Sequence, residues 1–156
     1  MKSQKGKRVM KILLATDGSA HSKAAVKEVA NRTFPAKTSV RIISVIDKVA
    51  ITRYTGPLGV LNEYHAEADH NALKLAEDAN EYAVKILHEK NPTLSVTTAV
   101  IDGSPKSAIL KEAETFGADL IVVGSHGYGA VERFMLGSVS HAVALHAKCS
   151  VEIVRK

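Results

Sequence analysis

Four glycines and several hydroxyl groups are concentrated in residues 124–140, GSHGYGAVERFMLGSVS. An apolar run, DLIVV, precedes this segment, and a helical pattern, VSHAVALHA, overlaps its end. Gly124 and Gly127 would let backbone N–H groups approach a ligand with no Cβ in the way. Gly137 and Ser138 begin the following helix, where free N–H groups and a hydroxyl suit a phosphate. Together these residues predict an anion site, although each one alone also fits a tight turn or a helix cap.

The common nucleotide-binding motifs do not match this segment. The dinucleotide fingerprint belongs after the first strand, where this chain has ATDGSA, and the third glycine of the later pattern is replaced by Glu132. No Gly-Lys-Ser/Thr sequence is present, and no lysine lies between Lys111 and Lys148. Arg133 is the cation of that stretch. Phosphates would therefore be held mainly by backbone and hydroxyl groups.

The elements that must position these residues alternate along the chain. Short, nearly continuous apolar runs predict five strands, at residues 9–16, 40–46, 94–101, 120–123 and 151–154. Helical patterns predict four helices, at residues 19–32, 64–90, 105–116 and 138–147. Strands joined by helices form right-handed βαβ units, so we expect a parallel sheet with helices on both faces.

Three predicted loops at the carboxyl ends of strands carry useful chemistry. They are TDGS at 16–19, SVID at 44–47 and the glycine segment that begins at Gly124. Ligands bind beyond the carboxyl ends of an open parallel sheet, where the winding direction switches. If the first and fourth strands are central neighbours, the first and last of these loops face each other across one crevice.

These residues resemble the nucleotide-binding signature of the universal stress protein family. The spacing Gly124-x2-Gly127-x9-Gly137-Ser138 is that signature, and the similarity covers nearly the whole chain through ILLATDGS, SVID, DGSP, ADLIVVGSHG and LGSVSHAV. The resemblance implies a Rossmann-like open five-stranded parallel sheet in the order 3-2-1-4-5. It also implies the ATP-binding branch of the family and a homodimer through the last strand, in which Glu152 places a charge.

The resemblance implies a base-binding half of the site. Ala15 and Thr16 would line the adenine, and the backbone of Val45 would read its edge. Asp17 would contact the ribose or the adenine from the end of the first strand. Val123, at the end of the fourth apolar run, completes this half.

The resemblance also implies a phosphate-binding half. Gly124 and Gly127 would approach the ribose and phosphates, and His126 between them could reach either group. ATP would bring Mg²⁺ held by its phosphates, with no metal ligand from protein side chains. The phosphate chain would be held at the start of the last helix by Gly137, Ser138, Val139 and Ser140.

The remaining histidines and the cysteine do not predict a metal or catalytic site. The pairs His65/His70 and His141/His146 are each five residues apart, roughly 140° around a helix, so neither pair shares a face. No G-x-S-x-G sequence is present for a serine hydrolase. Cys149 precedes an apolar strand and is interpreted as a core residue.

The charge and length of the chain restrict its class. Removing four N-terminal positive charges lowers the net charge from +5 to +1, which argues against nucleic acid as a partner; these are Lys2, Lys5, Lys7 and Arg8. No apolar run approaches the ~20 residues that cross a bilayer, and no signal-peptide core follows the basic start. We expect a flexible basic tail at 1–8, a single domain at 9–156 and a cytoplasmic protein that does not act at membranes.

The sequence favours an ATP-binding, homodimeric stress-response sensor or regulator with at most slow hydrolysis, because the site offers no evident general base or lysine. One alternative is an ATP-using hydrolase or transferase on the same fold, with Asp17 or His126 in chemistry. Another is an interaction protein with a vestigial crevice. The polar segment 48–64 is longer than a usual βα connection and fits a lid, a dimer contact or disorder equally well.

Overall fold

A five-stranded, all-parallel sheet forms the centre of the molecule in the computed structural model, which describes residues 8–55, 62–128 and 135–156. Its strand order is β3-β2-β1-β4-β5, which confirms the predicted Rossmann-like fold. The strands are β1 (Lys11–Ala15), β2 (Ser39–Ile46), β3 (Ser95–Asp102), β4 (Leu120–Gly124) and β5 (Ser150–Val154).

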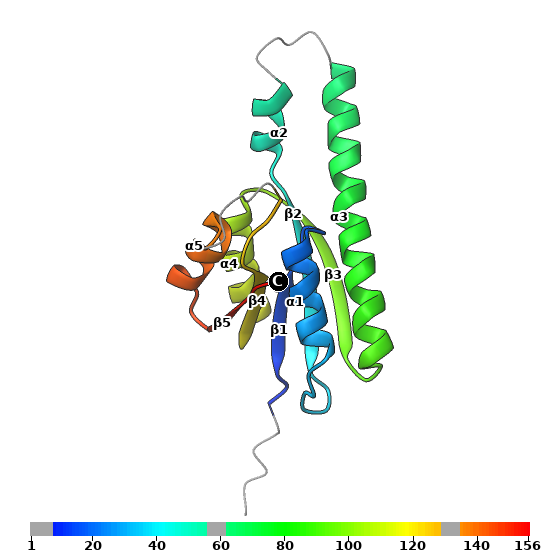
Figure 1. Ribbon diagram of the computed structural model, residues 1–156, viewed down its shortest axis with the longest axis vertical. Helices are drawn as coiled ribbons and strands as arrows, with labels where there is room; N and C mark the ends of the chain where they lie inside the picture. The colour runs from blue at the N-terminus through cyan, green and yellow to red at the C-terminus, as the bar shows by residue number, and fades with distance from the viewer. Residues whose placement is uncertain (1–7, 56–61, 129–134) are drawn as a thin grey trace, which may run out of the picture.

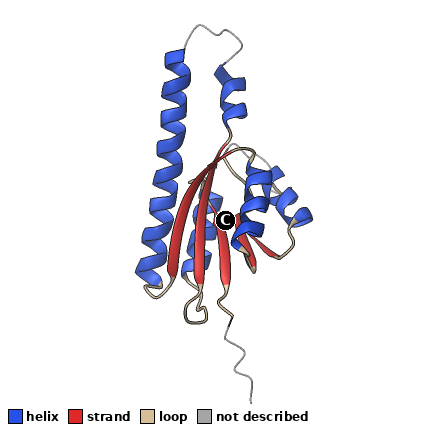
Figure 2. Ribbon diagram, turned by 180° about the vertical axis from the view of Figure 1, so that it is seen from behind, coloured by secondary structure: helices blue, strands red, loops and turns tan. Residues whose placement is uncertain are grey.

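Helices cover both faces of this sheet. α1 and α3 lie on one face, and α4 and α5 lie on the other (Figures 1 and 2). The helices are α1 (Ala20–Ala30), α2 (Lys48–Thr55), α3 (Asn62–Lys90), α4 (Pro105–Phe116) and α5 (Ser138–His146).

Side-chain alternation along the strands builds one core on each face. In β1, Ile12 and Leu14 pack toward α1 and α3, whereas Leu13 packs toward α4 and α5. All three are fully buried. Burial on both faces explains why the strand sequences are continuously apolar instead of alternating with polar residues.

Residue types that favour helix ends occur at the ends of α1 and α4. Ser19 caps α1, and its side chain accepts a hydrogen bond from the Ser22 N–H. Gly117 ends α4 in the left-handed conformation, at φ 69°. Ser104 occupies the cap position of α4 before Pro105, but its side chain makes no capping hydrogen bond.

The segment 48–64 differs from the sequence-based expectation, because much of it is helical. α2 occupies its first part and α3 begins at Asn62, while residues 56–61 lie outside the described part of the chain. The 29 residues of α3 span roughly 44 Å, but an eight-residue strand spans only about 26 Å. α2 and one end of α3 therefore stand beyond the carboxyl edge of the sheet (Figure 1).

The negative charge that the sequence places within the last strand, on Glu152, is neutralised by an ion pair within the same chain. Arg32, at the end of α1, donates two hydrogen bonds of 2.6 Å to the Glu152 carboxylate. It also donates to Glu28, and these two carboxylates raise the Arg32 pKa. The Glu152 side chain thus points toward α1 and away from the free edge of β5.

Two further expectations concern the chain termini and membranes. Residues 1–7 of the predicted basic tail lie outside the described residues, and Arg8 pairs with Asp119. Within the described ranges, none of the helices is both long and apolar enough to cross a membrane.

Candidate functional site

A cavity of about 720 Å³ opens at the carboxyl edge of the sheet, within the size range of small-molecule sites. β1 and β4 are adjacent and in register, so the loops that follow them meet here. α2, α4 and α5 supply further walls. All twelve residues of the predicted nucleotide site line this one cavity: Ala15, Thr16, Asp17, Val45, Val123, Gly124, His126, Gly127, Gly137, Ser138, Val139 and Ser140.

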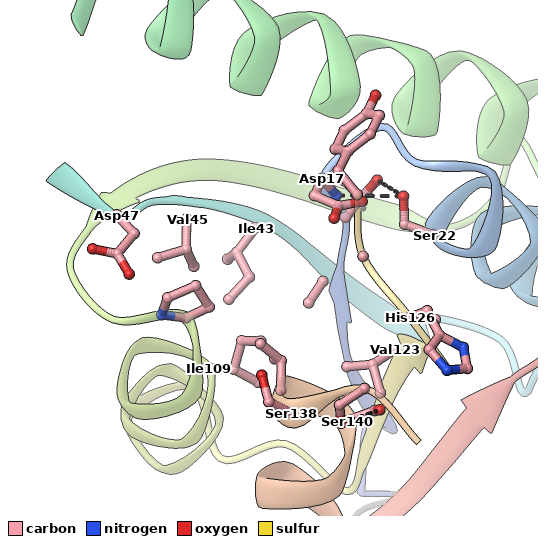
Figure 3. Close-up of a pocket in the computed structure, with 18 of the residues that line it drawn as sticks. Asp17, Ser22, Ile43, Val45, Asp47, Ile109, Val123, His126, Ser138 and Ser140 are labelled. Atoms are coloured by element: carbon pink, nitrogen blue, oxygen red, sulfur yellow. Dashed lines mark hydrogen bonds between the residues drawn. The ribbon is translucent and has the colours of Figure 1, made fainter. Parts of the chain in front are cut away.

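The walls divide into an apolar part and a polar part. Figure 3 shows Val45 and Asp47 at one end of the cavity and His126 at the other. Ile43 and Ile109 lie in the middle, while Ser138 and Ser140 line the side opposite Asp17 (Figure 3). Apolar walls of this kind suit a ring system, and the polar part offers donors to an anion.

The turn after β1 fixes Asp17 at the cavity. The Asp17 carboxylate accepts a 2.9 Å hydrogen bond from the Ser19 N–H, closing a local turn in which Gly18 has φ +78°. Thr16 is buried, and its hydroxyl is hydrogen-bonded to Ser22 of α1. Asp17 itself remains exposed, which leaves its carboxylate accessible to a ligand.

Gly124 lines the cavity, but its lack of a side chain serves the packing of α1. A Cβ at this position would lie 2.7 Å from the His21 carbonyl carbon and 2.8 Å from the Ser22 nitrogen. The end of β4 therefore approaches the first turn of α1 too closely for any other residue. The sequence-based interpretation, a glycine that admits a ligand, missed this structural reason.

Gly127 differs, because its nearest neighbour is a side chain. A Cβ there would lie 2.8 Å from the Asp17 Oδ2 atom. This places the glycine loop directly against the turn after β1, across the crevice that the sequence predicted. A side chain at position 127 would enter the cavity.

Ser125 joins the glycine loop to two other elements. It is 1% exposed, and its N–H donates a 2.8 Å hydrogen bond to the Val154 carbonyl of β5. Its own carbonyl accepts hydrogen bonds of 2.8 Å from the Gly137 N–H and from the Ser140 hydroxyl. A Cβ at position 137 would lie 2.9 Å from that carbonyl oxygen, so this junction requires glycine.

The start of α5 presents to the cavity N–H donors that have no partner among the described residues. Gly137 is the N-cap and has no side chain to satisfy the first N–H groups of the helix. The N–H groups of Ser138, Val139 and Ser140 therefore remain for a ligand. The Ser140 hydroxyl is committed to the Ser125 and Gly137 carbonyls, so Ser138 supplies the accessible hydroxyl.

The charges at the cavity are few. Among the described residues that line it, Asp17 and Asp47 are acidic, His126 is the ionisable base, and neither lysine nor arginine is present. Arg133, the cation expected nearby, lies outside the described residues. An anionic ligand would thus depend on main-chain N–H groups and the helix dipole.

Sequence reasoning missed several wall residues. Apolar ones come from β2, α2 and α4, and their types carry no signal beyond core packing: Ile43, Ala50, Ile51, Pro105 and Ile109. Tyr128 also lines the cavity while 73% exposed. Asp47 was in the predicted SVID loop, and its carboxylate accepts a 3.0 Å hydrogen bond from the Ala50 N–H at the start of α2.

Cys149 is half-buried and packs on the core shared with α4 and α5, as predicted. Burial, and secondarily the charge of Asp119, raises the pKa of its thiol, which disfavours the nucleophilic thiolate. No group of three or more potential metal-ligating side chains is present in the described ranges.

The fold and this cavity define a Rossmann-like protein with a cavity of small-molecule size at the carboxyl edge of its sheet. The model of the universal stress protein family matches residues 9–155, and the chain belongs to this family.

Relatives cover nearly the whole length of the chain. Universal stress protein YxiE of Bacillus subtilis is 34% identical over 151 residues, covering 93% of this chain and 98% of that protein. Among solved structures, the hypothetical protein MJ0577 is 28% identical with a TM-score of 0.80, covering 94% of this chain and 95% of its own. Universal stress protein UspA from Lactobacillus plantarum has a TM-score of 0.76 at 24% identity, and the match covers 95% of this chain and 99% of that protein.

We expect the two glycines of the loop to differ in their effect on stability. Replacing Gly124 with Ala forces a Cβ against the α1 backbone and should lower the free energy of unfolding by about 1–3 kcal/mol. Gly127→Ala should cost clearly less, because the side chain of Asp17 can rotate away. Urea unfolding of both variants measures the difference. Equal losses in the two variants would contradict this assignment.

Proposed function

We propose that this protein binds ATP, with Mg²⁺ on its phosphates, and acts as a homodimeric cytoplasmic regulator of a stress response. One observation carries the proposal: a single cavity is lined both by apolar side chains of β2 and α4 and by the start of α5, whose first N–H groups have no partner among the described residues. Such a cavity is complementary to a ligand with a flat ring at one end and phosphate at the other.

The base of the nucleotide fits the slot between β2 and α4. Ile43, Val45 and Ile109 line it from both sides, and apolar walls of this kind favour burial of an adenine ring. β2 ends beside the slot, and the main chain at Val45 would read the edge of the ring. Asp17 would accept a hydrogen bond from the ribose.

The phosphates fit the polar end. Main-chain N–H groups at positions 138–140 and the Ser138 hydroxyl would donate to phosphate oxygens. Gly127 leaves room for the chain of phosphates beside Asp17. The phosphates themselves would supply oxygen ligands to Mg²⁺, an ion that keeps several waters and binds readily through substrate phosphates.

Two solved universal stress proteins support an adenine nucleotide as the ligand class. One, from Arabidopsis thaliana, has AMP bound and is 18% identical to this chain, with a TM-score of 0.67. Another is in complex with cAMP and is 23% identical, with a TM-score of 0.60. The triphosphate is our inference for this chain, from the row of donors at the start of α5.

We infer a binding protein with at most slow hydrolysis, and not an enzyme. The Asp17 carboxylate is engaged in its local turn, and the described walls offer no lysine or arginine to stabilise phosphoryl transfer. The rival, an ATP-using hydrolase or transferase, would need Asp17 or His126 to act on the phosphates.

The homodimer is proposed to form through β5. β5 pairs with β4 along one edge, and no described strand pairs with its other edge. Val151, Ile153 and Val154 are only half-buried, so a second copy would cover apolar surface as well as unpaired main-chain groups. Glu152 does not oppose this pairing, since Arg32 already neutralises it.

ATP should stabilise the protein against heat. Mg-ATP at about 100 times its dissociation constant adds about 2.7 kcal/mol, which raises Tm by about 5–11 °C for a chain of this size. Gly127→Val should abolish the shift, because its side chain enters the cavity without touching backbone. Thr115→Val, on the exposed face of α4, is the control. An absent shift, or an equal shift in Gly127→Val, would refute the proposal.

ATP turnover should stay far below the ~1 s⁻¹ of protein kinases. Asp17→Asn keeps a side-chain oxygen that accepts the hydrogen bond from the Ser19 N–H but loses the negative charge, so this variant should retain the slow rate of turnover. Asp17→Ala also loses the hydrogen bond that closes the turn after β1. Phosphate release under single-turnover conditions measures the rate of ATP turnover in both variants. Rapid turnover that Asp17→Asn abolishes would favour the enzyme instead.

Sedimentation equilibrium should give twice the 16.7 kDa chain mass. The β5 amides that face away from β4 should exchange slowly in the dimer and quickly after dilution. A monomer at every concentration tested, or exchange at β5 that dilution does not change, would exclude this interface.

A further inference from the structure

Two histidines share one buried serine hydroxyl at the edge of the cavity. The Ser125 Oγ atom lies 3.1 Å from His21 Nδ1 and 3.0 Å from His126 Nδ1. The centroids of the two imidazole rings are 5.1 Å apart. His126 lines the cavity, whereas His21, in the first turn of α1, does not.

The hydroxyl has one proton, so it can donate to only one of the two Nδ1 atoms. When both rings are neutral, the other Nδ1 must carry its own proton and donate to Oγ. Oγ has two lone pairs and can also accept from both rings at once; when its own proton is donated within the cluster, there are two states of opposite polarity. In one, Ser125 donates to His126 and accepts from His21; in the other, both hydrogen bonds are reversed.

The polarity determines what His126 offers to a ligand. Its Nδ1 is engaged by Ser125, and its Nε2 has no partner among the described residues. In the first state Nε2 carries the proton and can donate to an anionic oxygen. In the second state Nε2 presents a lone pair, which would repel that oxygen.

We propose that His21 is a positioning residue that acts through Ser125 to hold His126 as an Nε2–H donor to a nucleotide phosphate. This inference rests on the proposed function. It assigns a role to a side chain outside the cavity and gives a site without a described lysine or arginine a second side-chain donor, besides the Ser138 hydroxyl.

The backbone packing holds His21 in place for this role. β4 contacts the first turn of α1 so closely that a Cβ at Gly124 would lie 2.7 Å from the His21 carbonyl carbon. The Ser125 main chain is bonded to β5 and α5. His21 and Ser125 are therefore fixed by separate contacts that do not depend on the histidine rings.

Calorimetric titration with Mg-ATP and with adenosine tests the relay. His21→Leu removes the donor to Oγ and should weaken ATP binding about tenfold, the effect of a lost hydrogen bond to a charged group. Adenosine has no phosphate, so its affinity should not change. His21→Asn can still donate to Oγ and should recover most of the ATP affinity. His88→Leu, at the exposed end of α3, is the control.

Nitrogen-15 spectra of the imidazoles provide an independent measurement, in mildly alkaline buffer where imidazoles are neutral. With ATP bound, His126 should carry its proton on Nε2 and His21 on Nδ1, and Ser125→Ala should remove this pairing of tautomers. Identical tautomers, or equal loss of ATP and adenosine binding in His21→Leu, would overturn the relay. So would ATP affinity in His21→Leu equal to that of the unaltered protein. If the unaltered protein binds no ATP, the proposed function itself fails, and the phosphate role of His126 with it.

Discussion

The buried main chain of Ser125 is the junction on which the candidate site depends. Through it the end of β4 is hydrogen-bonded to the end of β5 and to the start of α5, while the preceding glycine packs against α1. A buried carbonyl that accepts two hydrogen bonds is costly to leave unpaired. Because this junction holds α5 against the glycine loop, the unpaired N–H groups of α5 face the loop after β1 across a fixed gap.

The same junction explains why the glycines of the loop are not equivalent. A Cβ at Gly124 or Gly137 would meet neighbouring backbone, whereas one at Gly127 would meet only the carboxylate of Asp17. Two of the three glycines in the signature are therefore required by the packing of the protein around the cavity that they line. A nucleotide-binding signature can thus reflect the assembly of the helix start as much as the chemistry of the phosphate.

The fold was predictable because strands buried on both faces and helix ends such as Ser19 and Gly117 give strong local signals. The predicted site residues also converge, since the carboxyl ends of adjacent parallel strands necessarily meet. The sequence could not show that α2 forms a wall, because Ala50 and Ile51 are ordinary apolar residues whose contacts depend on tertiary packing. Nor could it show the sharing of Ser125 by His21 and His126, which lie 105 positions apart.

The central claim is that one nucleotide spans the cavity, with its base on β2 and its phosphates on α5. Amide chemical-shift mapping during an ATP titration tests this most directly. The account predicts that the largest changes occur at Gly127 and at the start of α5, with a second group at Val45, and that adenosine shifts only the second group. Changes confined to another face, or none at the start of α5, would contradict it.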